Sequence, residues 1–149
     1  MKVLFVLLAA AVGLCAGCTT VTMRKHPTVD LTRYQRVFVV QPFNENNHVD
    51  EFLAAEIRQT GRTASSGPLT MMPEDAEAVL SYSARWTWDF NAYIIELNAE
   101  LHTAHTKKKL AEVRFYQPSA RTAPPSVIAH AVIQKLFGSS GLANAKPEK

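Results

Sequence analysis

Two histidines in the second half of the chain have a spacing that could serve a metal ion. His102 and His105 lie where a predicted strand runs into a turn, and Glu100 is the nearest carboxylate on the same strand face. A protein metal site needs three or four ligands, and two solvated hairpin histidines explain the pattern more simply. The sequence therefore predicts no metal site.

A group of charged residues could support acid–base chemistry. Five of them are expected on one sheet face: Arg85, Glu96, Glu100, Glu112 and Arg114. Paired carboxylates can act as general acid and base, but on an open sheet such groups more often form cross-strand charge pairs worth roughly a few tenths of a kcal/mol. The sequence contains neither a Gly-x-Ser-x-Gly elbow nor a glycine-rich phosphate loop. We therefore predict no catalytic residues and no cofactor, and rank an enzyme that gathers Glu96, Glu100 and His102 last.

The N-terminal segment has the composition of an export signal. Lys2 precedes an apolar run from Val3 to Leu14, and Cys15-Ala16-Gly17-Cys18 follows. A membrane-spanning helix needs about 20 apolar residues, and this run is shorter. The pattern predicts a cleaved signal peptide over residues 1–17. The alternative is an ordinary secretory signal with two incidental cysteines.

Cys15-Ala16-Gly17-Cys18 resembles the bacterial lipobox, which lipoprotein signal peptidase reads. Ala16, Gly17 and Cys18 match that pattern, and Cys15 stands where leucine is commonest. The resemblance implies a diacylglyceryl thioether on Cys18, cleavage before it and acylation of the new amine. In enteric-type bacteria, Thr19 in place of Asp favours sorting to the outer membrane. We therefore expect a lipid anchor on Cys18 and a domain that faces the periplasm.

Charge and cysteine content exclude several classes of protein. The formal net charge is +3, which is weak evidence for nucleic-acid binding. A mature chain that keeps only a lipidated Cys18 has no thiol for a disulfide or a zinc ribbon. The basic clusters at Arg24-Lys25 and Lys107-Lys108-Lys109 fit a solvated surface, with contact to anionic head groups or lipopolysaccharide as the alternative.

Three segments alternate apolar and polar residues, which predicts an antiparallel meander with one buried face. They cover residues 78–88, 93–102 and 110–116. In the second segment, Tyr93 and Ile95 are expected to face the core with Leu97, and Ile94 to face solvent.

The remaining elements complete the predicted fold. Residues 34–41 form a strand that is apolar on both faces, and helices are expected from a cap near Asn47 to Gly61 and from Pro124 to Gly138. The order β-α-β-β-β-α predicts an α+β two-layer sandwich, in which a four-stranded, mostly antiparallel sheet carries two helices on one face. The predicted organisation is a lipidated tether over residues 18–33, one α/β domain over 34–138 and a flexible tail over 139–149.

Four aromatic residues cluster at the first hairpin of the meander. Trp86 and Trp88 share the apolar face and could cap the core, whereas Phe90 lies in the turn, where a core role is hardest to arrange. Tryptophan and tyrosine are frequent hot spots of protein interfaces. Trp88, Phe90 and Tyr93 are therefore the candidate partner contacts.

The run from Ala76 to Tyr82, followed by Trp86-Thr87-Trp88-Asp89 and Tyr93, resembles a group of small bacterial lipoproteins. Their domain carries an Ala-Asp-Leu-x-Val strand, a Trp-x-Trp-Asp turn and a tyrosine that starts the next strand. Asp75-Ala76-Glu77-Ala78 replaces the usual Ala-Asp pair, and His105-Thr106-Lys107 stands in place of Thr-Gly-Lys. The resemblance covers roughly residues 30–137. It implies a periplasm-facing α/β lipoprotein domain without an agreed activity.

These observations favour an interaction or structural accessory protein of the cell envelope. We expect it to bind the membrane through the lipid on Cys18 and to contact another envelope protein. The alternative is a binding module for a small ligand, metal, lipid or glycan that uses the sheet face or the connection over residues 62–75.

Overall fold

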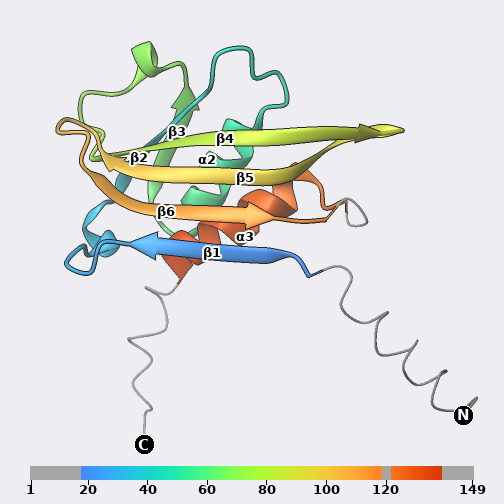
Figure 1. Ribbon diagram of the computed structural model, residues 1–149. Coiled ribbons are helices and arrows are strands. Elements are labelled where there is room, and N and C mark those ends of the chain that lie inside the picture. Colours follow the sequence, from blue (N-terminus) through green and yellow to red (C-terminus); the bar gives the residue numbers. More distant parts are fainter. Residues whose placement is uncertain (1–17, 119–121, 139–149) are drawn as a thin grey trace, which may run out of the picture.

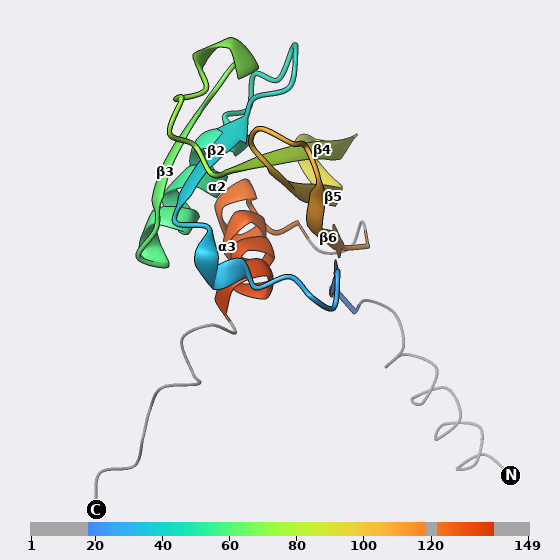
Figure 2. The same cartoon turned by 90° about the vertical axis from the view of Figure 1, so that its left-hand side faces the viewer.

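The computed structural model describes residues 18–118 and 122–138. Among these residues, six strands form one sheet in the order β1-β6-β5-β4-β2-β3. Helices α2 and α3 lie together on one side of that sheet (Figures 1 and 2). The strands are β1 (Thr20–Lys25), β2 (Arg36–Val40), β3 (Thr63–Gly67), β4 (Ala78–Asp89), β5 (Asn91–Thr103) and β6 (Lys109–Tyr116). The helices are α2 (Val49–Gln59), α3 (Pro125–Phe137) and two short 3-10 turns, η1 (Leu31–Arg33) and η2 (Leu69–Met71).

The sheet is larger than the sequence predicted and has mixed strand directions. Strand β2 pairs in parallel with both β3 and β4, whereas β1, β6, β5 and β4 are antiparallel neighbours. The prediction of a four-stranded, mostly antiparallel sheet is therefore wrong, although the protein is α+β. Strand β3 reads Thr-Ala-Ser-Ser-Gly. Backbone pairing holds these small residues in the sheet, so their side-chain types give almost no indication of a strand.

The first described residues join the sheet directly. Residues 20–25, which the sequence assigned to a tether, form the edge strand β1 beside β6. Val21 and Met23 are partly buried against the core, and Leu31 of η1 is fully inside it. Cys18 therefore stands only two residues before an ordered strand. The predicted signal peptide and tail, residues 1–17 and 139–149, lie outside the described residues.

The main core lies between the sheet and the two helices. Both helices bury apolar side chains at helical spacing, each worth about 1.5–3 kcal/mol when removed from water. The fully buried members include Leu53 and Ile57 of α2, Ile128, Val132, Ile133 and Leu136 of α3, and Val39, Leu80, Leu97, Leu101 and Val113 of the sheet. The Arg62 guanidinium closes one end of this core, 4.2 Å above the Phe137 ring.

Strand β2 is covered on both faces, as its sequence predicted. Val37 and Val39 belong to the main core. Phe38 points to the other side, where it packs with Ala76, Ala104 and the partly buried Met72. The connection before β4 and the turn between β5 and β6 together shield the far face of β2.

Helix α2 begins without a side-chain cap of the expected kind. Its N-cap residue is His48, with φ of 55° and no capping hydrogen bond from its side chain. The Glu45 carboxylate in the preceding loop accepts a bond from the Val49 amide at 3.3 Å and another from the Tyr82 hydroxyl at 3.1 Å. One acidic side chain therefore fixes the start of α2 against β4.

Candidate functional site

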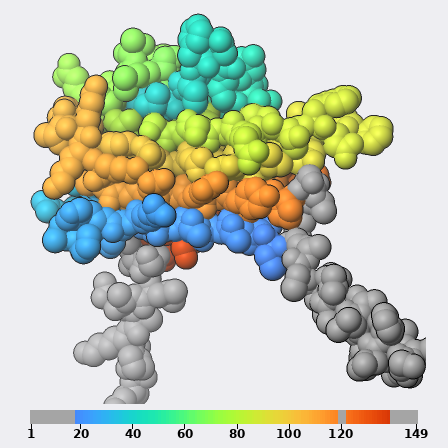
Figure 3. Space-filling view, viewed as in Figure 1, coloured from blue at the N-terminus to red at the C-terminus, as the bar shows by residue number. Residues whose placement is uncertain are grey.

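The sheet face opposite the helices is open over four strands. Figure 3 shows β4, β5, β6 and β1 side by side on the viewer's side, with no helix in front of them. Polar and charged side chains cover this face, because alternate residues of each strand point away from the core. The face is therefore broad, polar and accessible.

Glu96 is the centre of a charge network on the open face. Its carboxylate accepts bonds from Arg85 Nη2 and Arg114 Nη2, both at 2.9 Å, and from Asn98 Nδ2 at 3.1 Å. The Asn98 and Arg85 hydrogen bonds, with the two guanidinium charges, lower the pKa of Glu96. The two arginines keep about half of their side-chain surface in solvent.

A second network lies nearer the turn between β5 and β6. Lys109 Nζ donates to Glu100 Oε1 and Glu112 Oε2, each at 2.8 Å. These hydrogen bonds raise the pKa of Lys109, and the Lys109 bond lowers the pKa of Glu112. A general acid at neutral pH needs a carboxyl pKa shifted upward. The pKa shifts at Glu96 and Glu112 run the other way, because hydrogen bonds from neighbours on the same strand and nearby cationic side chains stabilise both carboxylates.

The two candidate metal-binding histidines are not brought together with further ligands. His102 Nε2 lies 3.5 Å from Glu100 Oε2, whereas His105 is exposed in the following turn. Over residues 18–118 and 122–138, no group of three or more His, Cys, Asp or Glu side chains could hold a metal ion.

A hollow of about 350 Å³ lies at the end of the sheet where β1 finishes and β6 begins. It is lined by Arg24, Lys25, His26, Lys109, Leu110, Ala111 and Glu112. The His26 amide donates to the Leu110 carbonyl at 3.3 Å, which holds the chain after β1 against β6. Both basic clusters seen in the sequence thus contribute residues to a shallow, charged depression.

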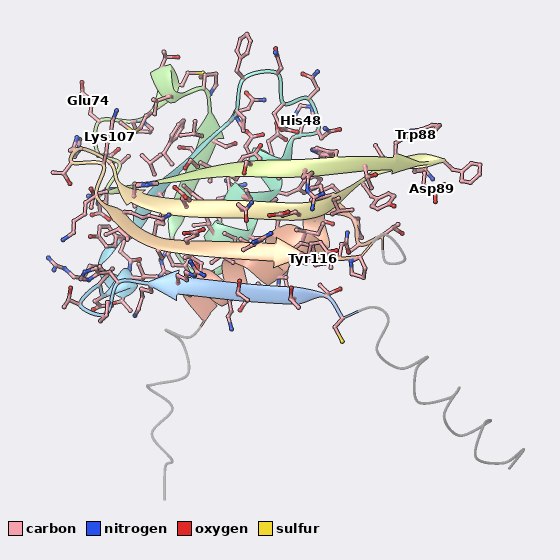
Figure 4. All side chains as sticks on the ribbon, in the orientation of Figure 1. His48, Glu74, Trp88, Asp89, Lys107 and Tyr116 are labelled. Atoms are coloured by element: carbon pink, nitrogen blue, oxygen red, sulfur yellow. The ribbon has the colours of Figure 1, made fainter. Side chains whose placement is uncertain are left out.

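At the opposite end of the sheet, the hairpin of β4 and β5 extends beyond its neighbours. Strand β6 ends at Tyr116, which pairs with Glu96, and the hairpin continues past this level to the turn at Phe90. Figure 4 shows Trp88 and Asp89 at the projecting tip, beyond Tyr116. Among the residues that the structure describes, the tip is a two-stranded ribbon without a third strand beside it.

The structure divides the predicted aromatic cluster into buried and exposed members. Tyr93 is 7% exposed and Trp86 packs partly against the core. Trp88 is 75% exposed and Phe90 is 90% exposed. Only these two of the three candidate contact residues are therefore accessible at the tip.

A β-bulge at Ile95 changes which side chains of β5 face the core. Arg85 pairs with Glu96, but Trp86 pairs with Ile94, so Ile95 is the extra residue of β5. The bulge turns Ile94 into the core, where it is fully buried, and the expectation that Ile94 faces solvent is wrong. A prediction that alternates inward and outward residues without interruption cannot include such an extra residue, so it places Ile94 on the wrong face.

Gln117 holds the bulged segment in place and was not anticipated from the sequence. Its backbone amide donates to the Ile95 carbonyl at 2.9 Å, and its Nε2 donates to the Ile94 carbonyl at 2.6 Å. Its Oε1 accepts from the Ala123 amide at 3.2 Å, and the residue is fully buried. The position of a glutamine directly after a predicted strand is the one sequence signal that could have indicated this role.

Other exposed apolar side chains lie on the connections near β2 and β3. Phe43 follows β2 and is 95% exposed, and Leu69 and Met71 of η2 are more than half exposed. Phe43 therefore offers a comparison for the hairpin tip, because it is an equally accessible aromatic residue elsewhere in the protein.

No helix among residues 18–118 and 122–138 combines the length and the apolar character needed to cross a membrane. Cys18 is exposed.

Comparison with known proteins identifies a shared fold. No protein-family model and no curated protein sequence matches the chain. The chain is similar to the PelC dodecamer from Paraburkholderia phytofirmans in two crystal forms, with 17% sequence identity over 80% of this chain in both comparisons. The form in space group C2, a point variant, has a TM-score of 0.58 and is covered over 98% of its length. The form in space group P6 has a TM-score of 0.53 and is covered over 94%. A minor lipoprotein from Acinetobacter baumannii has a TM-score of 0.41 at 16% identity, over 76% of this chain and 98% of its own.

Proposed function

We propose that this protein is a lipid-anchored, periplasm-facing accessory protein of the cell envelope, which binds another envelope protein through its open sheet face. The open face of β4, β5, β6 and β1 is the observation that carries the proposal. Both helices pack on the opposite side, so four strands present their polar side chains, and no other element within residues 18–118 and 122–138 covers them. The lipid on Cys18 is part of this proposal, supported by its lipobox resemblance and its exposed position before β1.

The charge networks on this face favour a macromolecular partner. Arg85 and Arg114 are already oriented by Glu96, so less side-chain entropy is lost when a partner carboxylate or carbonyl binds them. Exposed ion pairs contribute only about 0–1 kcal/mol to folding. These charges therefore contribute little to the stability of the domain.

A crosslinking experiment in the native envelope tests the proposal. Ser83 is exposed and lies opposite Asn98 on the open face, so a photoreactive residue there leaves the Glu96 network intact. Gln59, exposed at the end of α2 on the helix side, is the matched control position. We expect a discrete adduct from position 83 and none from position 59.

The mass of the adduct identifies the class of partner. The similar structures from Paraburkholderia phytofirmans are dodecamers, so a second copy of this chain is one partner that the experiment must separate from a different protein. Absence of an adduct at position 83, in folded protein whose Cys18 is shown by mass spectrometry to carry lipid, would contradict the proposed docking face.

The basic hollow supports a second candidate, a binding module for an anionic ligand. Arg24, Lys25 and Lys109 line its walls, although Glu112 and its bond to Lys109 offset part of that charge. A phosphate or carboxylate group would therefore have to compete with Glu112. Saturable binding of inorganic phosphate that is lost in Arg24→Ala would favour this candidate over the protein-docking face.

A further inference from the structure

The exposed aromatic tip and the proposed lipid attachment point lie at the same end of the sheet. We propose that the Trp88–Phe90 tip inserts into the membrane interface beside the lipid of Cys18 and gives the domain a second point of attachment. This inference rests on the proposed lipid anchor. It assigns the contact predicted at the hairpin to a bilayer surface.

Strand register places the two features. Thr20 pairs with Tyr116, Tyr116 pairs with Glu96, and Glu96 pairs with Arg85, so these residues form one row across β1, β6, β5 and β4. Cys18 precedes this row by two residues. The hairpin passes the row by four further residue pairs, from Trp86–Ile94 to Asp89–Asn91, or roughly 13 Å at about 3.3 Å per residue.

Both features leave the row in the same direction. Strand β1 runs away from Cys18 and is antiparallel to β6, and β6 is antiparallel to β5. The start of β1, the end of β6 and the tip of the hairpin therefore share one end of the molecule, as Figures 1 and 4 show. Strands β1 and β4 are three strand spacings apart, roughly 14 Å.

A lipid on Cys18 would bring this end of the domain against the bilayer. Only Thr19 separates the cysteine from β1, so the strand begins roughly 7 Å of chain from the anchor. The tip projects at least as far as the anchor from the shared row. The tip would therefore reach the head-group region when the strands lie along the membrane normal.

The chemistry of the tip fits a membrane interface. Tryptophan is enriched at the level of the lipid head groups, because its ring is apolar and its N–H can bond to polar neighbours. From Trp86 to Tyr93 the sequence holds one charged residue, Asp89. Its carboxylate limits insertion to the interface, since a charge in the hydrocarbon region is costly.

The backbone conformation at Phe90 indicates that the phenyl side chain does not stabilise the fold. Phe90 has φ of 61°, in the left-handed region that favours glycine or asparagine, and its ring is almost entirely in solvent. A phenyl ring there strains the backbone and buries little surface in the protein. A bilayer would supply the burial that the folded domain does not.

The basic clusters lie at the other end of the sheet. Arg24 and Lys25 finish β1, and Lys107 lies in the turn between β5 and β6, opposite Trp88 in Figure 4. They would therefore point away from the bilayer that holds the anchor. With two attachment points at one end, the strands stand upright and the open face looks along the membrane.

Fluorescence quenching by brominated lipids tests the insertion. The chain has two tryptophans, so Trp86→Phe leaves Trp88 as the only one. We expect Trp88 of the full lipidated protein, in vesicles of phosphatidylethanolamine and phosphatidylglycerol, to lose most of its emission when bromines are placed on the upper acyl-chain carbons. If Trp86→Phe does not fold, the difference between the unmodified protein and Trp88→Phe gives the same quantity.

A matched control moves the tryptophan to an equally exposed position. The variant Trp86→Phe, Trp88→Phe, Phe43→Trp carries its one indole on the loop after β2, and we expect no quenching of it. Trp88 emission that is insensitive to brominated lipid would overturn the inference, while a lipid on Cys18 found by mass spectrometry would leave the anchor intact. Shielding of Trp88 that follows protein density and ignores bromine would assign the tip to contact between protein copies and would equally overturn it. A Cys18 without lipid would remove the anchor and this inference together.

Discussion

Replacing Phe90 with asparagine is expected to stabilise the domain in solution. The residue sits at φ of 61° with 90% of its surface exposed. An ordinary L-residue in the left-handed region loses about 1–2 kcal/mol, and asparagine tolerates it better. Because the phenyl ring buries little surface, its removal costs little. We therefore expect Phe90→Asn to raise the free energy of unfolding by about 1 kcal/mol.

Urea denaturation followed by far-UV circular dichroism measures this change. With m-values of about 1–3 kcal/mol/M for small proteins, the midpoint should rise by roughly 0.3–1 M. Phe43→Asn is the control, because Phe43 is 95% exposed and its φ is not positive. That variant should stay within about 0.5 kcal/mol of the parent, as surface substitutions usually do.

An unchanged or lower midpoint for Phe90→Asn would refute the reasoning. It would mean that the phenyl ring makes stabilising contacts in the folded domain, and that its exposure is no sign of an external role. A rise in stability accompanied by weaker membrane contact would instead separate the role of Phe90 from folding. Such trade-offs are common where a residue serves function at the expense of stability.

The hydrogen bonds of the sheet and of the start of α2 support three further predictions. Gln117→Leu leaves the buried Ile94 carbonyl without its 2.6 Å partner and should lower the free energy of unfolding by about 2–3 kcal/mol in urea titrations; a loss below half of that would show that the bulge does not need the side chain. The pKa of Glu96 is lowered in the folded protein, so its ionised carboxylate stabilises the fold. This contribution is complete at a pH above the ordinary carboxyl pKa of 4.5, and it is lost as the pH falls through the lowered pKa of the folded state. Melting temperatures should thus fall less steeply on acidification in Glu96→Gln than in the parent, and parallel curves would argue against the pairing. Tyr82→Phe removes the 3.1 Å bond to Glu45 and should cost about 1 kcal/mol by the same titration, so an unchanged midpoint would deny that bond a role at the start of α2.

The meander and the helices could be predicted because their side chains alternate between water and the core. In β4, Leu80 and Tyr82 are buried and Ser83 is exposed, so apolar and polar residues alternate in the sequence with a period of two. The helices α2 and α3 bury their apolar residues at helical spacing in the same way. Solvent and core therefore sort these residues by type, and the pattern identifies the element.

Strand β3 and the bulge could not be predicted for a different reason. Strand β3 consists of small residues that pair through the backbone, and backbone bonds leave no trace in side-chain type. At the bulge, Tyr93, Ile94 and Ile95 are consecutive apolar residues, which fit either phase of a strand. Which of them faces the core depends on an extra residue opposite Arg85 and Trp86, and that is a property of two paired strands.

The candidate site was predicted in part. The sequence placed Arg85, Glu96 and Arg114 on one face, and the structure brings a guanidinium nitrogen of each arginine to 2.9 Å from the Glu96 carboxylate. It also placed Trp88, Phe90 and Tyr93 together. Strand periodicity does not show, however, how far the β4–β5 hairpin extends beyond the end of the adjacent strand β6. That length decides which aromatic residues are accessible.

The attachment of Cys18 to an edge strand has a mechanical consequence. If Cys18 carries the proposed lipid, a pull on that lipid would act along β1, parallel to the strand and across the hydrogen bonds that join Thr20–Lys25 to β6. Those bonds are perpendicular to the strands, so they would share such a force in shear instead of opening one after another from an end. Tension between the membrane and a bound partner would thus pass into the middle of the sheet through a six-residue ladder, and the domain could transmit force without first unravelling at its anchor.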